Sequence, residues 1–124
     1  MLKNNEIAQQ ITEQDQWVEL VENGMSLSDV PQKQRSQEVC MVAVRKNGMS
    51  LYHVQPEQGS PEIYLAAVKQ NGGALQYVPK DKRSPEICLA AVNNNVIALK
   101  SVPKDVILKS QDIAIAAVMQ NGLH

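Results

Sequence analysis

The chain has 124 residues, 44% of them hydrophobic, and a formal net charge of −1. This length fits one domain, and the hydrophobic content is enough for a core. No run approaches the roughly 18 apolar residues of a membrane span, and the first residues lack the apolar stretch of a signal peptide. Cytoplasmic residence is therefore expected, although signal-independent export into a host would leave no mark in the sequence.

A unit of about 24 residues recurs along the chain. Asparagines recur at spacings of 24, 24, 24 and 26, and capping serines open successive units at Ser36, Ser60, Ser84 and Ser110. Fixed periods of this length are typical of stacked supersecondary units. We expect one all-α domain over residues 1–124, a solenoid-like stack of short helix hairpins. Its parts would be a degenerate cap unit at 1–35, repeats at 36–59, 60–83 and 84–109, and a terminal half-repeat at 110–124.

The N-terminal stretch from about Asn4 to Glu22 is predicted to be one longer helix. The apolar residues in its repeat positions and in the segment after it are Trp17, Leu20, Leu27 and Val30. Terminal repeats are commonly atypical, because one of their sides faces water. We therefore expect this stretch to cap the stack.

Each later unit is predicted to begin with a helix of about ten residues. Ser-Pro-Glu at Ser60–Glu62 and Ser84–Glu86 combines a capping serine, a proline suited to the first turn and an acid at the positive end of the helix dipole. The body of each helix is apolar nearly all round, as expected of a helix between two neighbours. Asn-Gly pairs, as at 47–48 and 71–72, predict a left-handed helix end, repeated at 121–122.

A second, shorter helix is predicted in each unit, because leucine and valine recur three residues apart, as at Leu75 and Val78. Prolines 31, 79 and 103 would stop it, with Pro56 one residue late in its unit. Polar loops then lead to the next serine.

The fourth unit departs from this pattern in two ways. Val96 replaces the glycine, so either Asn95 takes the left-handed position or the two helices join differently. The loop 104–109 is two residues longer and holds three apolar residues, which either pack onto the last helix or contact a partner. After it, the chain has only the first helix of a fifth unit, so Ile113, Ile115 and Val118 lack one expected cover. This end could form a dimer or partner contact.

The two cysteines, Cys40 and Cys88, occupy the same place two units apart, with Tyr64 at that place between them. Packed helices lie about 8–10 Å apart, whereas a disulfide needs Cα atoms within roughly 7 Å. We expect free, structural thiols in a reducing compartment.

A search for catalytic chemistry finds none. The only histidines, His53 and His124, belong to no metal-binding or nucleophile-base pattern. The prediction is a non-enzyme with no catalytic residue, no metal site and no cofactor.

Charge is unevenly distributed along the chain. Residues 1–31 carry one lysine against six acids, while the remainder carries eleven bases against seven acids. Such polarity can steer a charged partner. Nucleic acid is an unlikely ligand, because this basic excess is modest and two tyrosines are too few for a base-stacking series.

Exposed positions of the short helices and the loops after them are where a partner would be recognised, since the repeat keeps its core constant. Tyrosine and methionine are favoured at interfaces. The candidate partner-binding residues are Met49, Tyr52, His53, Gln76, Tyr77, Lys80, Arg83 and Lys100.

The motif Ala-Val-x-x-Asn-Gly-x-x-Leu-x-x-Val, present at 43–54 and 67–78 and altered at 91–102, resembles the bacterial helical repeat family known as domain of unknown function 4116. The resemblance covers roughly Asp15 to Gly122. It implies a helical repeat found in bacterial proteins, including multi-domain effectors of intracellular pathogens. It implies no catalytic residues.

These features together predict non-enzymatic protein binding. The most concrete version is a small bacterial inhibitor, such as an immunity protein, that occludes a toxin or enzyme partner. The alternative is an interaction or targeting module of a secreted bacterial effector, and a weak nucleic-acid-binding repeat is third. A homodimer through the C-terminal helix is also compatible with the sequence.

Overall fold

The computed structural model describes residues 13–122, and every regular element in that range is a helix, so the all-α prediction is confirmed. The α-helices are α2 (Glu13–Glu22), α3 (Gln37–Lys46), α4 (Pro61–Gln70), α5 (Pro85–Asn94), α6 (Lys104–Lys109) and α7 (Gln111–Gly122). The 3₁₀ helices are η1 (Leu27–Asp29), η2 (Gln32–Gln34), η3 (Gly48–His53), η4 (Pro56–Gln58), η5 (Gly72–Tyr77), η6 (Lys80–Lys82) and η7 (Val96–Ser101). No helix in the described range is long and apolar enough to cross a bilayer.

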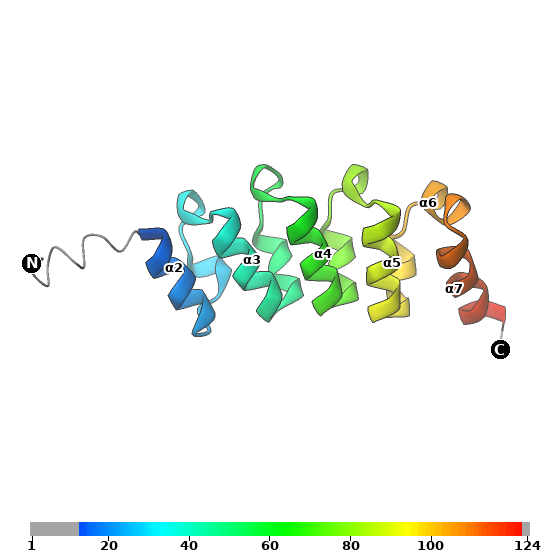
Figure 1. The fold of residues 1–124 in the computed structure, drawn as a ribbon, viewed down its shortest axis with the longest axis horizontal. Coiled ribbons are helices and arrows are strands. Elements are labelled where there is room, and N and C mark those ends of the chain that lie inside the picture. Colours follow the sequence, from blue (N-terminus) through cyan, green and yellow to red (C-terminus); the bar gives the residue numbers. More distant parts are fainter. Residues whose placement is uncertain (1–12, 123–124) are drawn as a thin grey trace, which may run out of the picture.

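The α-helices stand side by side in one row, in the order of the chain (Figure 1). Behind them η1, η3, η5 and η7 form a second layer, in which each 3₁₀ helix packs against the next. η3 and η5 also contact both the α-helix of their own unit and that of the following unit. The hydrophobic core lies between the two layers and includes Leu51, Ile63 and Leu75, each at most 2% exposed.

The predicted helix starts are confirmed by their capping bonds. The hydroxyl oxygens of Ser36, Ser60 and Ser84 accept hydrogen bonds from backbone N–H groups three residues later, at 3.2–3.3 Å. α3, α4 and α5 each have ten residues. A serine and a first-turn proline therefore set the start of α4 and of α5, as the Ser-Pro-Glu motif predicts.

The predicted second helix of each unit is present as a 3₁₀ helix. Three residues per turn place side chains at i and i+3 on one face. This period explains the leucine–valine spacing, since Leu75 and Val78 are both buried. The prolines do end these helices, but in the first three units each also leads into a further short turn, η2, η4 or η6, that the sequence analysis treats as a loop.

The predicted left-handed helix ends are wrong. Asn47, Asn71 and Asn95 are extended, with φ near −150°, and no described residue other than Gly24 has a positive φ. Each asparagine ends one helix and caps the next, because its side-chain oxygen accepts a bond of 2.9–3.0 Å from the N–H two residues on. Asparagine is therefore present as a cap rather than for a left-handed backbone.

Gly48 and Gly72 are needed for close packing rather than for an unusual φ. A Cβ added at either glycine would collide with a backbone carbonyl of the next α-helix, that of Ala67 or Ala91. The same helix supplies a bond in return: the Gly72 N–H donates to Oδ1 of Asn94 at 2.6 Å, and the Gly48 N–H donates to Oε1 of Gln70 at 2.5 Å. One backbone donor and one side-chain amide thus fix the spacing at each of these two interfaces.

Val96 stands where the previous two units have this glycine, and the packing changes there. Gly48 and Gly72 are buried, whereas Val96 is 38% exposed. α7 packs on α5, η7 and α6, and it tilts away from the line of the preceding helices (Figure 1). Asn95 keeps the extended cap conformation, so the two helices of this unit join as in the others. Because Val96 has a side chain, the backbone of the next helix cannot approach it as closely as α4 and α5 approach Gly48 and Gly72.

The loop predicted at 104–109 is the helix α6, and its three apolar residues differ in their surroundings. Val106 is buried at 7% exposure and Ile107 packs against the core, whereas Leu108 is 86% exposed. The packing alternative is therefore correct for two of the three residues.

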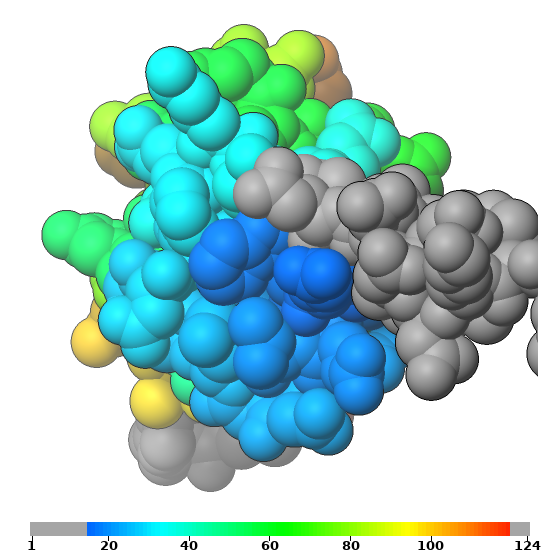
Figure 2. Space-filling view, turned by 90° about the vertical axis from the view of Figure 1, so that its left-hand side faces the viewer, coloured from blue at the N-terminus to red at the C-terminus, as the bar shows by residue number. Residues whose placement is uncertain are grey.

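The N-terminal unit agrees with the prediction only in part. α2 begins at Glu13 in the described range, and the predicted start at Asn4 lies outside it. Leu27 and Val30 are buried as expected, but Leu20 is 42% exposed and Val21 fills the core in its place. The view along the row from the N-terminal end shows α2, in blue, forming the outer surface (Figure 2). Within the described residues, α2 packs against α3 and η2.

The C-terminal helix also differs from the prediction. α7 continues through Asn121 and Gly122, so the expected stop before that pair is wrong. Ile113 is fully buried, whereas Ile115 and Val118 are 46% and 67% exposed. Two of the three predicted residues are therefore exposed, whereas Ile113 is covered.

Candidate partner-binding surface

Three of the predicted residues meet in an aromatic cluster on the 3₁₀ layer. The ring of Tyr52 lies edge-to-face with that of Tyr77, with centroids 5.3 Å apart, and with that of His53 at 5.1 Å. Tyr52 is 66% exposed, and the other two rings are half-buried. Edge-to-face pairs hold aromatic rings in a defined orientation. The cluster is therefore an ordered, partly exposed apolar surface.

The backbone of η3 and η5 explains why these rings gather. Leu51 and Leu75 turn into the core, so the residues after them turn outward. Position 52 is Tyr, the equivalent position 76 is Gln, and position 100 is Lys, each 24 residues after the last. The second layer therefore displays a column of side chains that changes from aromatic to cationic along the row.

Met49 and Gln76 lie in η3 and η5, the two 3₁₀ helices that carry the aromatic cluster. Met49 is half-buried and packs against the core. The exposed Gln76 donates from its side-chain amide to the backbone oxygen of Gly73 at 3.1 Å. Both side chains are at least partly exposed, so a partner that binds the aromatic rings could also contact them.

Arg83 has a structural role that the sequence analysis missed. Its Nε donates to the oxygen of Val78 at 2.8 Å, one terminal nitrogen to that of Ser101 at 2.8 Å, and the other to that of Gln76 at 3.0 Å. Arg35, 48 residues earlier, makes the equivalent bonds to Val30, His53 and Ser28. Each arginine joins two neighbouring 3₁₀ helices. The sequence did contain a signal of this role, because each arginine directly precedes a capping serine, Ser36 or Ser84.

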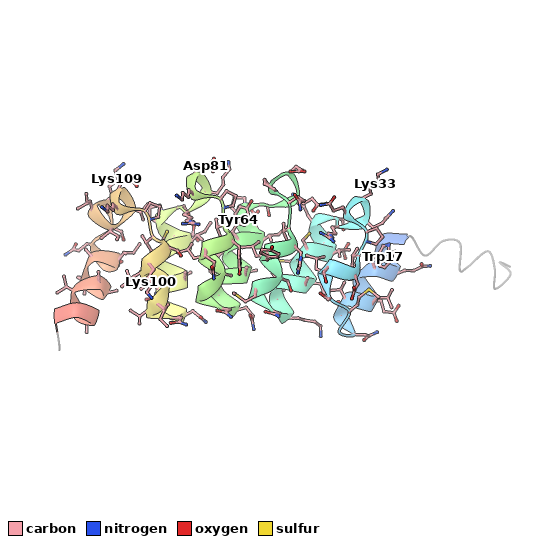
Figure 3. All side chains as sticks on the ribbon, turned by 180° about the vertical axis from the view of Figure 1, so that it is seen from behind. Trp17, Lys33, Tyr64, Asp81, Lys100 and Lys109 are labelled. Atoms are coloured by element: carbon pink, nitrogen blue, oxygen red, sulfur yellow. The ribbon has the colours of Figure 1, made fainter. Side chains whose placement is uncertain are left out.

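Lys80 and Lys100 lie at an open cavity of about 610 Å³ between η6, the end of η7 and α6. Lys104 and two carboxylates, those of Asp81 and Asp105, also line it, as does Arg83. Figure 3 shows Asp81 on the edge formed by the turns and Lys100 on the 3₁₀ layer. Lys104 was not predicted, because its segment was expected to be an irregular loop.

The predicted free thiols are confirmed, and both lie in the core. Cys40 and Cys88 are unpaired and fully buried. Burial raises the pKa of each thiol to about 11, partly opposed by the positive charge of Arg35 or Arg83. Thiols that are protonated at neutral pH are poor nucleophiles and poor metal ligands. A structural role fits both.

Within the described residues, no group of three or more His, Cys, Asp or Glu side chains is placed to hold a metal ion.

A separate apolar patch lies on α7, where Ala114, Ile115, Val118 and Met119 surround a shallow hollow of about 240 Å³. The aromatic cluster, the basic cavity and the α7 patch are the surface features considered for partner binding.

Comparison with known proteins gives one match. Residues 60–107 match the model of a family described as domain of unknown function (DUF4116). No curated protein and no solved structure matches this chain. The matched residues run from the capping serine of α4 into α6 and include η5, α5 and η7. The resemblance seen in the repeat motif is thus confirmed over residues 60–107.

Proposed function

We propose that this chain is a non-enzymatic protein-binding helical repeat whose 3₁₀ layer contacts the partner. The observation that carries this proposal is the partly exposed aromatic cluster of Tyr52, His53 and Tyr77. Tyrosine supplies a large contact area with few rotatable bonds, and it is enriched among residues that dominate binding energy.

The frame beneath the cluster supports a binding role. Tyr52 follows the buried Leu51, and Tyr77 precedes the buried Val78. Arg35 donates to the backbone oxygen of His53, the third member of the cluster. A partner would therefore meet side chains whose backbone is already ordered, which lowers the entropic cost of association.

The most concrete form of this function is an inhibitor that occludes a toxin or enzyme partner, as an immunity protein does. The uneven distribution of charge along the chain, acidic at the N-terminal end and basic in the remainder, favours that form. A second candidate is an interaction or targeting module of a secreted bacterial effector. The exposed α7 patch favours it, because Ile115, Val118 and Met119 are each 46–67% exposed on one short helix.

Affinity purification of the tagged protein from its native cell, followed by mass spectrometry, tests the proposal. We expect a stoichiometric protein partner that is retained by the wild type and lost from the Tyr52→Ala/Tyr77→Ala variant. Leu108→Ala is the matched control, since Leu108 is an 86% exposed apolar residue outside the cluster.

Retention by the tyrosine variant would contradict the proposed surface. If the same partner were lost on Val118→Glu instead, the α7 patch and the effector-module candidate would be favoured. Recovery of nucleic acid alone would contradict protein binding altogether.

A further inference from the structure

The basic cavity is built where two similar turns follow each other. Lys80 and Asp81 lie in one wall, and Lys104 and Asp105 lie in the other. Each pair follows a proline, Pro79 or Pro103, and the two prolines are one 24-residue unit apart in sequence. The corresponding turns of the first two units read Pro-Gln-Lys and Pro-Glu-Gln. The third and fourth units are therefore the adjacent pair in which lysines face one cavity from both turns.

The cations of the cavity differ in their availability. All three nitrogen positions of the Arg83 guanidinium donate to backbone oxygens. Lys80, Lys100 and Lys104 are exposed, and none of them forms an ion pair with another residue of the described range 13–122. Three ammonium groups thus remain free to donate hydrogen bonds to a ligand, while Arg83 holds the wall in place.

We propose that this cavity binds an acidic peptide segment of the protein partner, with glutamate or aspartate carboxylates directed at Lys80, Lys100 and Lys104. The inference rests on the proposed protein-binding function and extends it to the chemistry of the partner. A lysine ammonium offers three donors and no acceptor, so carboxylate oxygens are matched ligands. A volume of about 610 Å³ is suited to a few side chains of a peptide.

The two acids of the cavity favour a peptide over nucleic acid. Asp81 and Asp105 flank the lysines and would repel a continuous phosphodiester chain, whereas a peptide can place an uncharged or basic residue beside them. The cavity also has no aromatic side chain in its lining on which a base could stack. Nucleic-acid binding is therefore one of the outcomes that the test must separate.

The test measures fluorescence anisotropy of a labelled hexaglutamate peptide titrated with the whole chain, beside labelled hexaglutamine and a six-nucleotide thymidine strand. We expect hexaglutamate to bind, hexaglutamine not to bind, and hexaglutamate affinity to fall as salt increases. Lys100→Glu/Lys104→Glu should lower that affinity about tenfold or more. Both lysines are exposed, so the variant should keep its fold, which far-ultraviolet circular dichroism verifies.

Lys33→Glu is the matched control, because Lys33 lies in the equivalent turn η2 on the same edge, at the opposite end of the row (Figure 3). It should leave hexaglutamate affinity unchanged. A loss of binding free energy about half that of the double variant would overturn the proposal, since Lys33→Glu changes the net charge by half as much and net charge rather than the cavity would then explain binding. Tighter binding of the thymidine strand than of hexaglutamate would also overturn it.

Two measurements separate this inference from the proposed function. If the co-purified partner depends on Tyr52 and Tyr77 but hexaglutamate does not bind, the aromatic surface stands and the acidic-peptide inference is wrong. Salt-dependent self-association in sedimentation velocity, lost in Lys100→Glu/Lys104→Glu, would overturn it in favour of the acidic N-terminal end of a second copy.

Discussion

At the scale of single residues, two positions five residues apart on either side of the capping serines of α3, α4 and α5 hold either an arginine and a cysteine or a glycine and a tyrosine. Arg35 precedes Cys40, and Arg83 precedes Cys88, whereas Gly59 precedes Tyr64 in the unit between them. A Cβ at Gly59 would lie 2.6 Å from Cζ of the Tyr64 ring. The tyrosine therefore occupies space that the arginine position needs in the neighbouring units, and a small thiol accompanies each arginine.

This exchange predicts coupling between positions 59 and 64. Gly59→Arg alone should destabilise the fold by collision, and Tyr64→Cys alone should destabilise it by leaving a cavity. The double variant restores the pair found in both neighbouring units. A double-mutant cycle from urea denaturation should give a favourable coupling free energy of about 0.5–3 kcal/mol.

Additive single effects would contradict this reading. Gly59→Arg combined with Ile97→Ala is the control, because Ile97 lies 57% exposed in another unit. That pair should show no coupling.

The buried thiols predict a loss of stability at high pH. Cys40 and Cys88 have a pKa of about 11 in the folded chain against an ordinary 9.0. As the pH rises above 9.0, the unfolded chain releases these protons while the folded chain keeps them, so the free energy of unfolding falls until about pH 11. Urea denaturation at pH 8 and pH 10 should show this fall.

The Cys40→Ala/Cys88→Ala variant provides the comparison, since it removes both titrating groups. Its free energy of unfolding should fall less between the two pH values than that of the wild type. Equal losses would show that other groups, such as Tyr64, whose pKa burial also raises, cause the effect.

At the scale of elements, the sequence predicts what depends on local chemistry. Serine caps, first-turn prolines and the three-residue spacing of Leu75 and Val78 act within one unit, and the corresponding helices are present. The function of Gly72 could not be predicted in this way, because the atom that excludes a Cβ belongs to the next unit, in α5. The recurrence of Arg35 and Arg83 indicates a shared role, but the acceptors of the Arg83 bonds could not be predicted, because they are backbone oxygens of two different units.

The residues of the candidate site likewise differ in whether local sequence could predict them. Tyr52 and Tyr77 were predictable as exposed positions of a short helix, and the structure places their rings in contact. Lys104 was not predictable as a wall of the cavity, because its segment was expected to be a loop, whereas it begins α6, which packs Val106 into the core. Local pattern predicts exposure, whereas the juxtaposition of residues requires the packing of whole elements.

The interface glycines predict a positional effect of alanine. Gly72→Ala should lower the free energy of unfolding by about 1–3 kcal/mol, because its Cβ meets the backbone of α5, which cannot rotate away. Gly73→Ala should have a smaller effect, since its nearest neighbour is a side-chain atom, Oδ1 of Asn71, at 3.2 Å. Chemical denaturation of both variants checks the order, and a larger loss for Gly73→Ala would contradict it.

At the scale of the whole molecule, the α-helices and 3₁₀ helices of the row mainly contact those of adjacent units. In such arrays, stability is approximately a sum of unit and nearest-neighbour terms, so the two ends can respond separately. The single tryptophan, Trp17, lies in α2 at the N-terminal end, while Ile113 is buried at the base of α7. Tryptophan fluorescence therefore reports on the N-terminal end, whereas circular dichroism reports on the helices of the whole chain.

This arrangement predicts that Ile113→Ala will move part of the dichroism transition to lower urea and leave the fluorescence transition in place. Leu75→Ala, in the centre, should move both and cost about 2–5 kcal/mol. Coincident transitions in both variants would show instead that the row unfolds as one cooperative body.

The pairing of residues across each capping serine has a consequence for recombining such chains. A 24-residue block cut at Ser60 would carry Tyr64 but leave Gly59 behind, and joining it after Arg35 would set an arginine against the tyrosine ring. A block cut after the valine that ends a 3₁₀ helix, between residues 54 and 55, keeps the pair together. The module that can be exchanged, grafted or inserted thus begins upstream of the cap that marks it in the sequence.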